Sequence, residues 1–235
     1  MPDFPETASG AEEPARKIPP ASLARLPIYL RALNALLADS VERVSSEELA
    51  EAAGVKSAML RKDLSYLGSF GTRGVGYDVQ FVSRKISALL GLTQEWRVAI
   101  VGAGNLGRAL ARYSGFTTRG FEVVALFDAD RSIIGTQVGW LKVSDVDSLE
   151  AELERSGTNM AVLSVPAAVA QELCDRLVAA GVTSILSFAP VVLQVPPHVQ
   201  VRKVDMGTEL QILAYHAQRA QEARARSGSR AGTAR

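Results

Sequence analysis

Three glycines with the spacing G-x-G-x-x-G directly follow an apolar run that ends at Val101. Glycines at this spacing permit a tight turn, a close approach of the backbone to a pyrophosphate, and close packing of a helix on a strand. The helix that follows such a turn presents free N–H groups and a positive dipole end to phosphate. We therefore predict a nucleotide-binding loop that consists of Gly102, Ala103, Gly104, Asn105, Leu106 and Gly107.

An acidic residue at the end of the next apolar run adds a second feature of the same site. Asp128 lies 21 residues beyond Gly107, and dinucleotide-binding folds place a ribose-binding carboxylate at about this distance. Such a carboxylate repels a 2′-phosphate, so it favours NAD(H) over NADP(H). Asp130 is an alternative for this role, and Arg131 is a complication because an arginine here accommodates a 2′-phosphate.

A helix with a basic and hydroxyl-bearing face is predicted over about residues 57–67. At 100° per residue, Leu60, Leu64 and Leu67 share its inward face. The opposite side carries Ala58, Lys62, Ser65 and Tyr66, with Arg61 at its margin. Asp63 is nearer the buried side, where it can pair with an arginine. This pattern is typical of a helix that reads DNA, although a solvated surface also accounts for Arg61 and Lys62.

The segments on either side of this helix complete a winged-helix pattern. Ser45 and Glu48 form a capping box that starts a short preceding helix, and Gly54 ends it. The glycine-rich residues 71–79 predict a hairpin, or wing, with Arg73 at its tip; narrow minor grooves attract such an arginine. Helix–turn–helix patterns also occur in all-α proteins, so the DNA-binding interpretation depends on the hairpin and the local charge.

The composition sets the broad class. Of the 235 residues, 47% are hydrophobic and 22% are charged, which is ordinary for a soluble globular protein. The net charge of +1 conceals a basic segment, because residues 16–91 hold 11 Lys and Arg against 7 Asp and Glu. A single cysteine, Cys174, excludes an internal disulfide and favours a cytoplasmic location. We expect no signal peptide, no membrane span and no His/Cys metal site.

Strand and helix signals alternate after residue 96, which predicts a parallel sheet with helices on both faces. The strands are predicted at 97–101, 122–127, 160–165, 184–188 and 199–204, with a weak one at 139–141. The helices are predicted at 105–115, 145–156 and 167–180, and a capping box at Thr208 starts a last one to about Gln221. Upstream, Leu26, Leu30, Leu33 and Leu37 predict a first helix that has Pro27 in its first turn.

These elements predict an α/β fold class with an N-terminal winged helix-turn-helix domain, a Rossmann-type domain and a C-terminal helix. The predicted organisation is a disordered arm at 1–17, a winged-helix DNA-binding domain at 18–91, an NAD(H)-binding Rossmann domain at 92–207, a C-terminal helix at 208–223 and a disordered tail at 224–235.

Catalytic groups are missing from this pattern. A dehydrogenase needs a general acid or base beside the nicotinamide and a substrate pocket. His198 lies in a loop between strands, His216 lies on the last helix, and Tyr113, on the helix after the glycine loop, is equally a core residue. We therefore expect no enzyme. The alternative is a small NAD-dependent oxidoreductase whose N-terminal helices serve dimerisation.

The sequence resembles the Rex family of redox-sensing transcriptional repressors from about Ile18 to Gln221. The resemblance rests on 61–68 (RKDLSYLG), 71–77 (GTRGVGY), 101–107 (VGAGNLG), 127–130 (FDAD), 188–193 (FAPVVL) and 204–206 (VDM). It implies a homodimer with a C-terminal helix exchanged between subunits. It also implies that the apo or NAD⁺ form binds a palindromic operator in double-stranded DNA and that NADH releases it.

The resemblance also assigns residue roles. Arg31 looks like the family's arginine that pairs with an aspartate of the other subunit, here Asp205, and Tyr113 looks like the tyrosine that bonds the same aspartate in the other nucleotide state. Met206 stands where some members have an aromatic residue, so the nicotinamide contact is softer here. Asn105 replaces a basic residue found in some members, which removes one contact.

The predicted contacts form three groups. Those to NADH or NAD⁺ are the loop residues 102–107 with Asp128, Pro166, Ala189, Pro190 and Met206. Those to DNA are Ser57, Ala58, Arg61, Lys62, Ser65, Tyr66, Arg73 and Gly74. The switch residues are Arg31, Tyr113 and Asp205.

Overall fold

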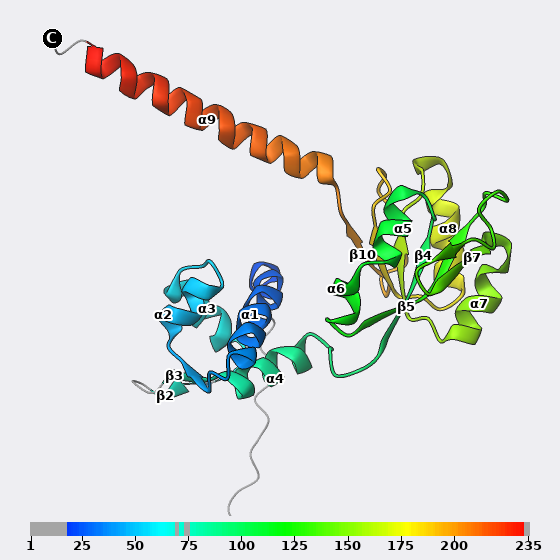
Figure 1. The fold of residues 1–235 in the computed structure, drawn as a ribbon, viewed down its shortest axis with the longest axis horizontal. Coiled ribbons are helices and arrows are strands. Elements are labelled where there is room, and N and C mark those ends of the chain that lie inside the picture. The colour runs from blue at the N-terminus through cyan, green and yellow to red at the C-terminus, as the bar shows by residue number, and fades with distance from the viewer. Residues whose placement is uncertain (1–17, 69–70, 73–75, 233–235) are drawn as a thin grey trace, which may run out of the picture. The chain divides into compact units, whose positions relative to one another are not determined.

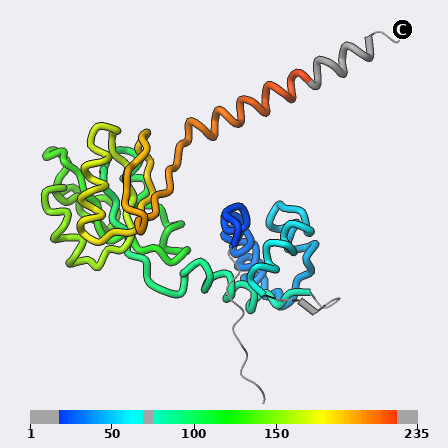
Figure 2. Tube along the Cα trace, turned by 180° about the vertical axis from the view of Figure 1, so that it is seen from behind, coloured from blue at the N-terminus to red at the C-terminus, as the bar shows by residue number. Residues whose placement is uncertain are grey.

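The computed structural model describes residues 18–68, 71–72 and 76–232, and side chains within 18–68 and 76–222 (Figure 1). The chain divides into two compact units, Met1–Gln94 and Glu95–Arg235, which Figure 2 shows along the Cα trace. Each unit has its own hydrophobic core. The predicted arm at 1–17 lies outside the described residues.

The first unit combines helices with a small antiparallel sheet. Its elements are α1 (Pro20–Ala38), β1 (Arg43–Val44), α2 (Ser46–Ala52), α3 (Ser57–Ser65), β2 (Gly71–Thr72), β3 (Gly76–Asp78) and α4 (Val79–Leu89). The strand order is β1-β3-β2, and both pairings are antiparallel. The predicted order of helix, turn, helix and hairpin is therefore confirmed. The short strand β1 was not predicted from the sequence.

Local signals at α2 act as predicted. The Ser45 hydroxyl accepts the Glu48 N–H at 3.1 Å, and the Glu48 carboxylate accepts the Ser45 N–H at 2.8 Å, which confirms the capping box. Gly54 follows the helix with a φ of 68°, a conformation that glycine adopts without strain. This turn sets the angle at which α3 leaves α2.

The helix α1 begins earlier than predicted. It starts at Pro20, and Pro27 lies in its interior rather than in its first turn. Proline at the first position needs no N–H partner, whereas Pro27 leaves the carbonyl of Leu23 without its helical donor. Leu23 is 45% exposed, so water can reach that side of the helix. The apolar stripe is buried at Leu26, Leu30 and Leu33, but Leu37 is exposed.

The second unit is built on a mostly parallel sheet. Its strands are β4 (Trp96–Val101), β5 (Phe121–Asp128), β6 (Gln137–Val138), β7 (Leu141–Asp145), β8 (Met160–Leu163), β9 (Ser184–Ser187) and β10 (Gln200–Lys203). Their order is β10-β9-β8-β4-β5-β7-β6, and β6 alone pairs antiparallel among the described strands of this sheet. Without β6, this is the order of a dinucleotide-binding Rossmann fold.

Helices cover both faces of this sheet. They are α5 (Asn105–Ala111), α6 (Ser114–Thr117), the 3₁₀ helix η1 (Val146–Ser148), α7 (Leu149–Ser156) and α8 (Ala167–Ala179). The last helix, α9 (Met206–Gly232), is not part of either covering layer, and its side chains from Met206 to Gln221 are exposed. One face packs Val101 and Phe127 against α7 and α8. The other packs Val98 and Ile100 against α5 and α6. These two apolar layers hold the carboxyl ends of β4, β5 and β8 in fixed register.

Three predicted elements of this unit need correction. The predicted helix 105–115 ends at Ala111, and Tyr113 lies before the separate short helix α6. The weak strand at 139–141 is replaced by β6, a turn and the parallel strand β7. The last helix starts at Met206, where the Asp205 carboxylate accepts the N–H groups of Gly207 and Thr208, so Asp205 replaces Thr208 as the cap.

The predicted disordered tail at 224–235 is also wrong as far as Gly232, where α9 ends. The segment after residue 217 is rich in Ala, Gln, Glu and Arg, which are strong helix formers. The backbone therefore continues as a helix past the Ser-Gly dipeptide at 227–228 that suggested a disordered tail.

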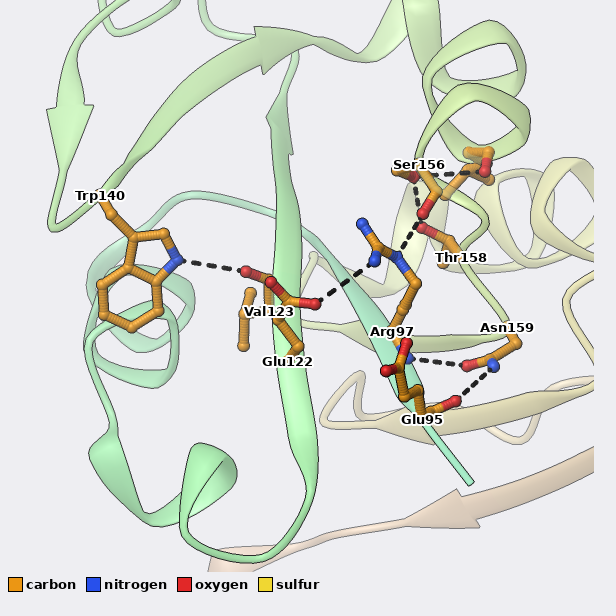
Figure 3. Close-up of polar contacts among 9 residues, drawn as sticks. Glu95, Arg97, Glu122, Val123, Trp140, Ser156, Thr158 and Asn159 are labelled. Carbon is orange, nitrogen blue, oxygen red and sulfur yellow. Dashed lines mark hydrogen bonds and ion pairs between the residues drawn. The ribbon is translucent and has the colours of Figure 1, made fainter. Parts of the chain in front are cut away.

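A polar cluster at the opposite end of the sheet from the glycine loop fixes the start of the second unit (Figure 3). The Asn159 side chain accepts the Arg97 N–H at 3.0 Å and donates to the Glu95 carbonyl at 3.1 Å. The Arg97 guanidinium donates to the Ser156 carbonyl and pairs with Glu122 at 3.5 Å. The chain is thus anchored to the sheet from Glu95 onward.

Candidate functional site

A cleft of about 370 Å³ opens at the carboxyl ends of β4, β5 and β8. It lies where the strand order reverses between β4 and β8, which is where open α/β sheets bind their ligands. The residues that line it at the ends of the three strands include Val101, Gly102, Gly104, Asp128, Ser164 and Pro166.

The glycines give the loop its close approach to the sheet. Gly102 has a φ of 100°, and a Cβ there would overlap the Ser164 carbonyl. A Cβ at Gly107 would overlap the carbonyl of Gly102. At Gly104, by contrast, no atom lies within 4 Å of where a Cβ would be. The loop is therefore packed tightly toward the protein and has open space at its middle glycine, which fits a bound pyrophosphate.

The two candidate acids after β5 differ in their contacts. The Asp128 carboxylate accepts the N–H of Ala103 at 2.6 Å and that of Asp130 at 2.9 Å, and it lines the cleft. Asp130 instead accepts the N–H and the hydroxyl of Ser132 at 2.9 and 2.7 Å, and these bonds lower its pKa. Asp130 does not line this cleft. The geometry therefore favours Asp128 for a ribose.

The cleft brings together only part of the predicted nucleotide set. Gly102, Gly104, Asp128 and Pro166 line it. Ala103, Asn105, Leu106 and Gly107 belong to the same loop and helix without lining it. Ala189 and Pro190 follow β9, and Met206 begins α9 with 60% of its surface exposed; none of these three lines the cleft.

An ion pair that the sequence does not reveal lies at this cleft. Arg176 on α8 lines it and donates to the Glu150 carboxylate at 2.7 and 2.8 Å. It also donates to the Val146 carbonyl at 2.9 Å. The hydrogen bond from Arg176 lowers the pKa of Glu150 to about 2. These residues have no characteristic spacing in the sequence, and only the packing of α8 beside η1 and α7 brings them together.

The face of α3 agrees with the helical-wheel prediction. Leu60 and Leu64 are buried, and Leu67 packs on the same core. Ala58, Arg61, Lys62 and Ser65 are exposed, whereas Ser57 and Tyr66 are half-buried. Arg73 and Gly74, at the predicted tip of the wing, lie outside the described residues.

The two basic residues of this face differ in their partners. The Arg61 guanidinium pairs with Glu47 of α2 at 2.9 Å and donates to the Ser46 hydroxyl at 3.2 Å. For Lys62, no ion-pair partner is found within residues 18–68 and 76–222. A phosphate near α3 would therefore meet one free ammonium and one guanidinium that is already paired.

The inward face of α3 carries a buried carboxylate. Asp63 is 1% exposed and accepts hydrogen bonds from Arg25 at 2.6 and 2.7 Å and from the Tyr29 hydroxyl at 2.6 Å. Burial alone would raise its pKa, but the bonds from Arg25 and Tyr29 outweigh burial and hold the pKa at about 2. Burial and the bond to Asp63 together raise the pKa of Tyr29 to about 12. The expectation that Asp63 pairs with an arginine is confirmed.

This depressed pKa predicts a loss of stability in acid. The carboxylate favours the folded state above pH 4 and loses that contribution as the pH falls from about 4 to about 2. A shift of nearly two units corresponds to about 2 kcal/mol. In calorimetry between pH 5 and 2, the wild type should lose about that much more unfolding free energy than an Asp63→Asn variant, which has no proton to bind. Parallel losses would contradict this account.

The predicted switch residues are divided between the two units. Arg31 is exposed on α1. Tyr113 is 50% exposed and packs edge-on against Phe116, with ring centroids 5.3 Å apart. Asp205 lies 3.6 Å from Lys203, and its pKa is lowered first by the Thr208 N–H and then by that lysine. Their predicted pairing involves a partner subunit and stays a prediction.

Other classes of site find no support in the described parts of the chain. No group of three or more His, Cys, Asp or Glu side chains there can hold a metal ion. No helix there has both the length and the apolar character to cross a membrane. Neither His198 nor His216 lines the cleft.

Models of known protein families match both halves of the chain. Residues 17–65 match the model described as "Putative DNA-binding protein N-terminus", and residues 93–191 match the model described as "CoA binding domain". A protein of Streptomyces griseus named redox-sensing transcriptional repressor Rex is 62% identical over 205 residues, which cover 87% of this chain and 81% of that protein. A protein of the same name from Desulfitobacterium hafniense is 47% identical over 200 residues, covering 85% and 95%.

Solved structures give the same result. The structure of RSP, a Rex-family repressor, in complex with NAD⁺ and operator DNA matches with a TM-score of 0.80 and 35% identity. The match covers 88% of this chain and 96% of that one. RSP in complex with NADH matches with a TM-score of 0.78 and 33% identity over 89% and 98% of the two chains.

Proposed function

Because the chain belongs to the Rex family of redox-sensing transcriptional repressors, we propose that it represses transcription in response to the balance between NADH and NAD⁺. The observation that carries the proposal is the nucleotide cleft in one unit of a chain whose other unit presents the exposed basic face of α3. The relatives reported above are named as transcriptional repressors, which supports a role without catalysis for this chain. As a repressor, the protein acts in the cytoplasm.

The cleft provides the groups that a dinucleotide needs. The open space at Gly104 admits a pyrophosphate against the loop backbone, and Asp128 accepts hydrogen bonds from the adenosine ribose hydroxyls. A carboxylate here opposes a phosphorylated ribose, so it favours NAD(H) over NADP(H) and over coenzyme A. The remaining predicted contacts, at Ala189, Pro190 and Met206, would bind the nicotinamide end of the dinucleotide.

The α3 face provides the DNA contact. Lys62 binds a phosphate or a base edge, and Ala58 and Ser65 are small enough to let the helix enter the major groove. Arg73 of the wing binds in the adjacent minor groove. Two copies related by two-fold symmetry would bind the two halves of a palindromic operator.

The homodimer that this requires has support in the second unit. The described apolar side chains of α9 are exposed, with Leu210 66% and Leu213 61% accessible. The same unit has an apolar cleft of about 500 Å³, lined partly by Phe116, Met160 and Leu186. A C-terminal helix exchanged between subunits would cover such a cleft and bury its own leucines.

NADH releases the operator only if it favours the non-binding state more strongly than NAD⁺ does. The dihydronicotinamide ring is uncharged, whereas the oxidised ring is a cation. Moving a cation into an apolar interface costs more desolvation free energy. A closed dimer that buries the ring therefore binds NADH more tightly than NAD⁺. Met206, beside the ring, determines the size of this difference in affinity.

Arg31 gives a test of the switch. If Arg31 pairs with Asp205 of the partner subunit in the operator-binding state, Arg31→Ala should weaken operator binding at least about tenfold, since each charge-assisted contact contributes roughly 1.5 kcal/mol or more. NADH affinity should not fall, because the lost contact stabilises the state that NADH disfavours. Anisotropy of labelled operator and NADH fluorescence measure the two affinities. Unchanged operator binding would rule out this role of Arg31.

The oxidoreductase alternative makes a different prediction. It requires substrate-dependent turnover of NADH that persists when Arg61 and Lys62 are both replaced by Ala. A repressor should instead select a palindromic DNA from a random library. NADH should then dissociate the complex of the protein with that DNA. NADH turnover with no selected DNA would overturn the proposal.

A further inference from the structure

The carboxylate of Asp63 connects the DNA-reading helix to the first helix of the chain. Asp63 lies on α3 between Lys62 and Leu64, on the side opposite the exposed face. All its charged and hydroxyl donors come from α1, where Arg25 and Tyr29 are one helical turn apart. The Arg25 guanidinium also donates to the Ser22 hydroxyl one turn earlier, at 3.5 Å.

The geometry of this cluster is directional. Arg25 uses its Nε and one terminal nitrogen on the two carboxylate oxygens, and the Tyr29 hydroxyl donates to Oδ2. A forked pair of this kind fixes the plane of the carboxylate as well as its distance. Rotating α3 about its axis, or sliding it along α1, would break all three bonds together. Apolar contacts among leucines tolerate such shifts far better, because they have no preferred angle.

Stability alone is a poor explanation for the cluster. Replacing a buried ion pair by apolar side chains of similar volume is often neutral or stabilising, and buried ionic groups are best attested as devices that fix register. Here the register that is fixed is that of the helix whose outer face carries Lys62 and Ser65. The arginine partner is three-quarters buried, at 25% exposure, and Tyr29 is fully buried, so water does not compete freely for these bonds.

We propose that Asp63 is a positioning residue for DNA recognition, because its bonds to Arg25 and Tyr29 hold α3 at the rotation and height on α1 that aim its exposed face at the operator. This inference rests on the proposed repressor function. It predicts that losing the cluster lowers the preference for operator over other DNA more than it lowers general DNA affinity. General DNA affinity depends on phosphate contacts, which tolerate small shifts of the helix. The preference for operator depends on base contacts, which do not tolerate such shifts.

The test uses three full-length variants and two DNA duplexes, the selected palindrome and a scrambled duplex of equal composition. Asp63→Asn removes the charge and keeps the shape. The triple variant Arg25→Met, Tyr29→Phe and Asp63→Leu replaces the three central side chains with apolar ones. Of their polar partners it leaves only the Ser22 hydroxyl, which can instead donate to a carbonyl of its own helix. Glu51→Gln, an exposed carboxylate on α2, is the control for charge alone.

The readout is the ratio of the affinity for the palindrome to the affinity for the scrambled duplex. If Asp63 only stabilised the fold, this ratio would not change in a variant that folds. We expect the ratio to fall at least tenfold in the triple variant, with its melting temperature and NADH affinity close to the wild type. Asp63→Asn should show the same loss of preference, and Glu51→Gln should keep the wild-type ratio. A folded triple variant whose ratio stays within twofold of the wild type would overturn the inference. A wild type with no operator preference would instead overturn the proposed function.

Discussion

The Asp128→Ala variant should lose NADH affinity by at least about 100-fold and should keep its operator bound at NADH concentrations that release the wild type. Two charge-assisted hydrogen bonds to the ribose disappear, each worth roughly 1.5–3 kcal/mol. The carboxylate also holds the Ala103 N–H at 2.6 Å, so the glycine loop loses a support. Operator affinity without nucleotide should stay within about twofold, because α3 lies in the other unit.

Asp130→Ala is the matched control for this prediction. Asp130 lies two residues away and binds Ser132 rather than facing the cleft. Its variant should keep NADH affinity within about threefold of the wild type, measured by NADH fluorescence or calorimetry. If Asp130→Ala lost the affinity and Asp128→Ala did not, the ribose contact would belong to Asp130.

The Lys62→Ala variant should weaken operator binding by about 100-fold, the second large effect that we expect. Each half-site of a palindrome loses one contact, and two contacts of about 1.4 kcal/mol each correspond to two factors of ten. If Lys62 binds phosphate, the magnitude of the slope of log affinity against log salt should also fall by about one unit for each half-site. NADH affinity should not change.

Lys85→Ala separates this effect from a general loss of positive charge. Lys85 is exposed on α4, where its ammonium lies 5.7 Å from the centre of the Phe81 ring. Both variants remove one lysine from the first unit, so only a direct contact distinguishes them. Equal operator binding by Lys62→Ala and the wild type, or an equal loss in both variants, would show that α3 does not place Lys62 against DNA.

The sequence predicts the parts of the site that depend on local backbone geometry. The spacing of Gly102 and Gly107 reflects a turn that a Cβ would block, and Asp128 lies at the end of the next strand. Helix periodicity likewise identifies Leu60 and Leu64 as buried. Such features are visible because each depends on residues that are close in the chain or regularly spaced.

Contacts between distant segments are where prediction from the sequence stops. Periodicity indicates that Asp63 faces inward, but its partner Arg25 lies 38 residues away and no pattern selects it among the arginines. The pair of Glu150 and Arg176 is separated by 26 residues and has the same difficulty. The prediction that Tyr113 lies within a helix is wrong for a local reason. The helix ends at Ala111, and no glycine or proline directly after it marks that end.

The most direct test of redox sensing is a titration of the protein–operator complex with NADH at fixed NAD⁺ and fixed salt, followed by anisotropy of the labelled palindrome. We predict that NADH lowers operator affinity at least tenfold, that NAD⁺ alone changes it far less, and that Asp128→Ala abolishes the response. A specific operator complex that is indifferent to both nucleotides would contradict the account.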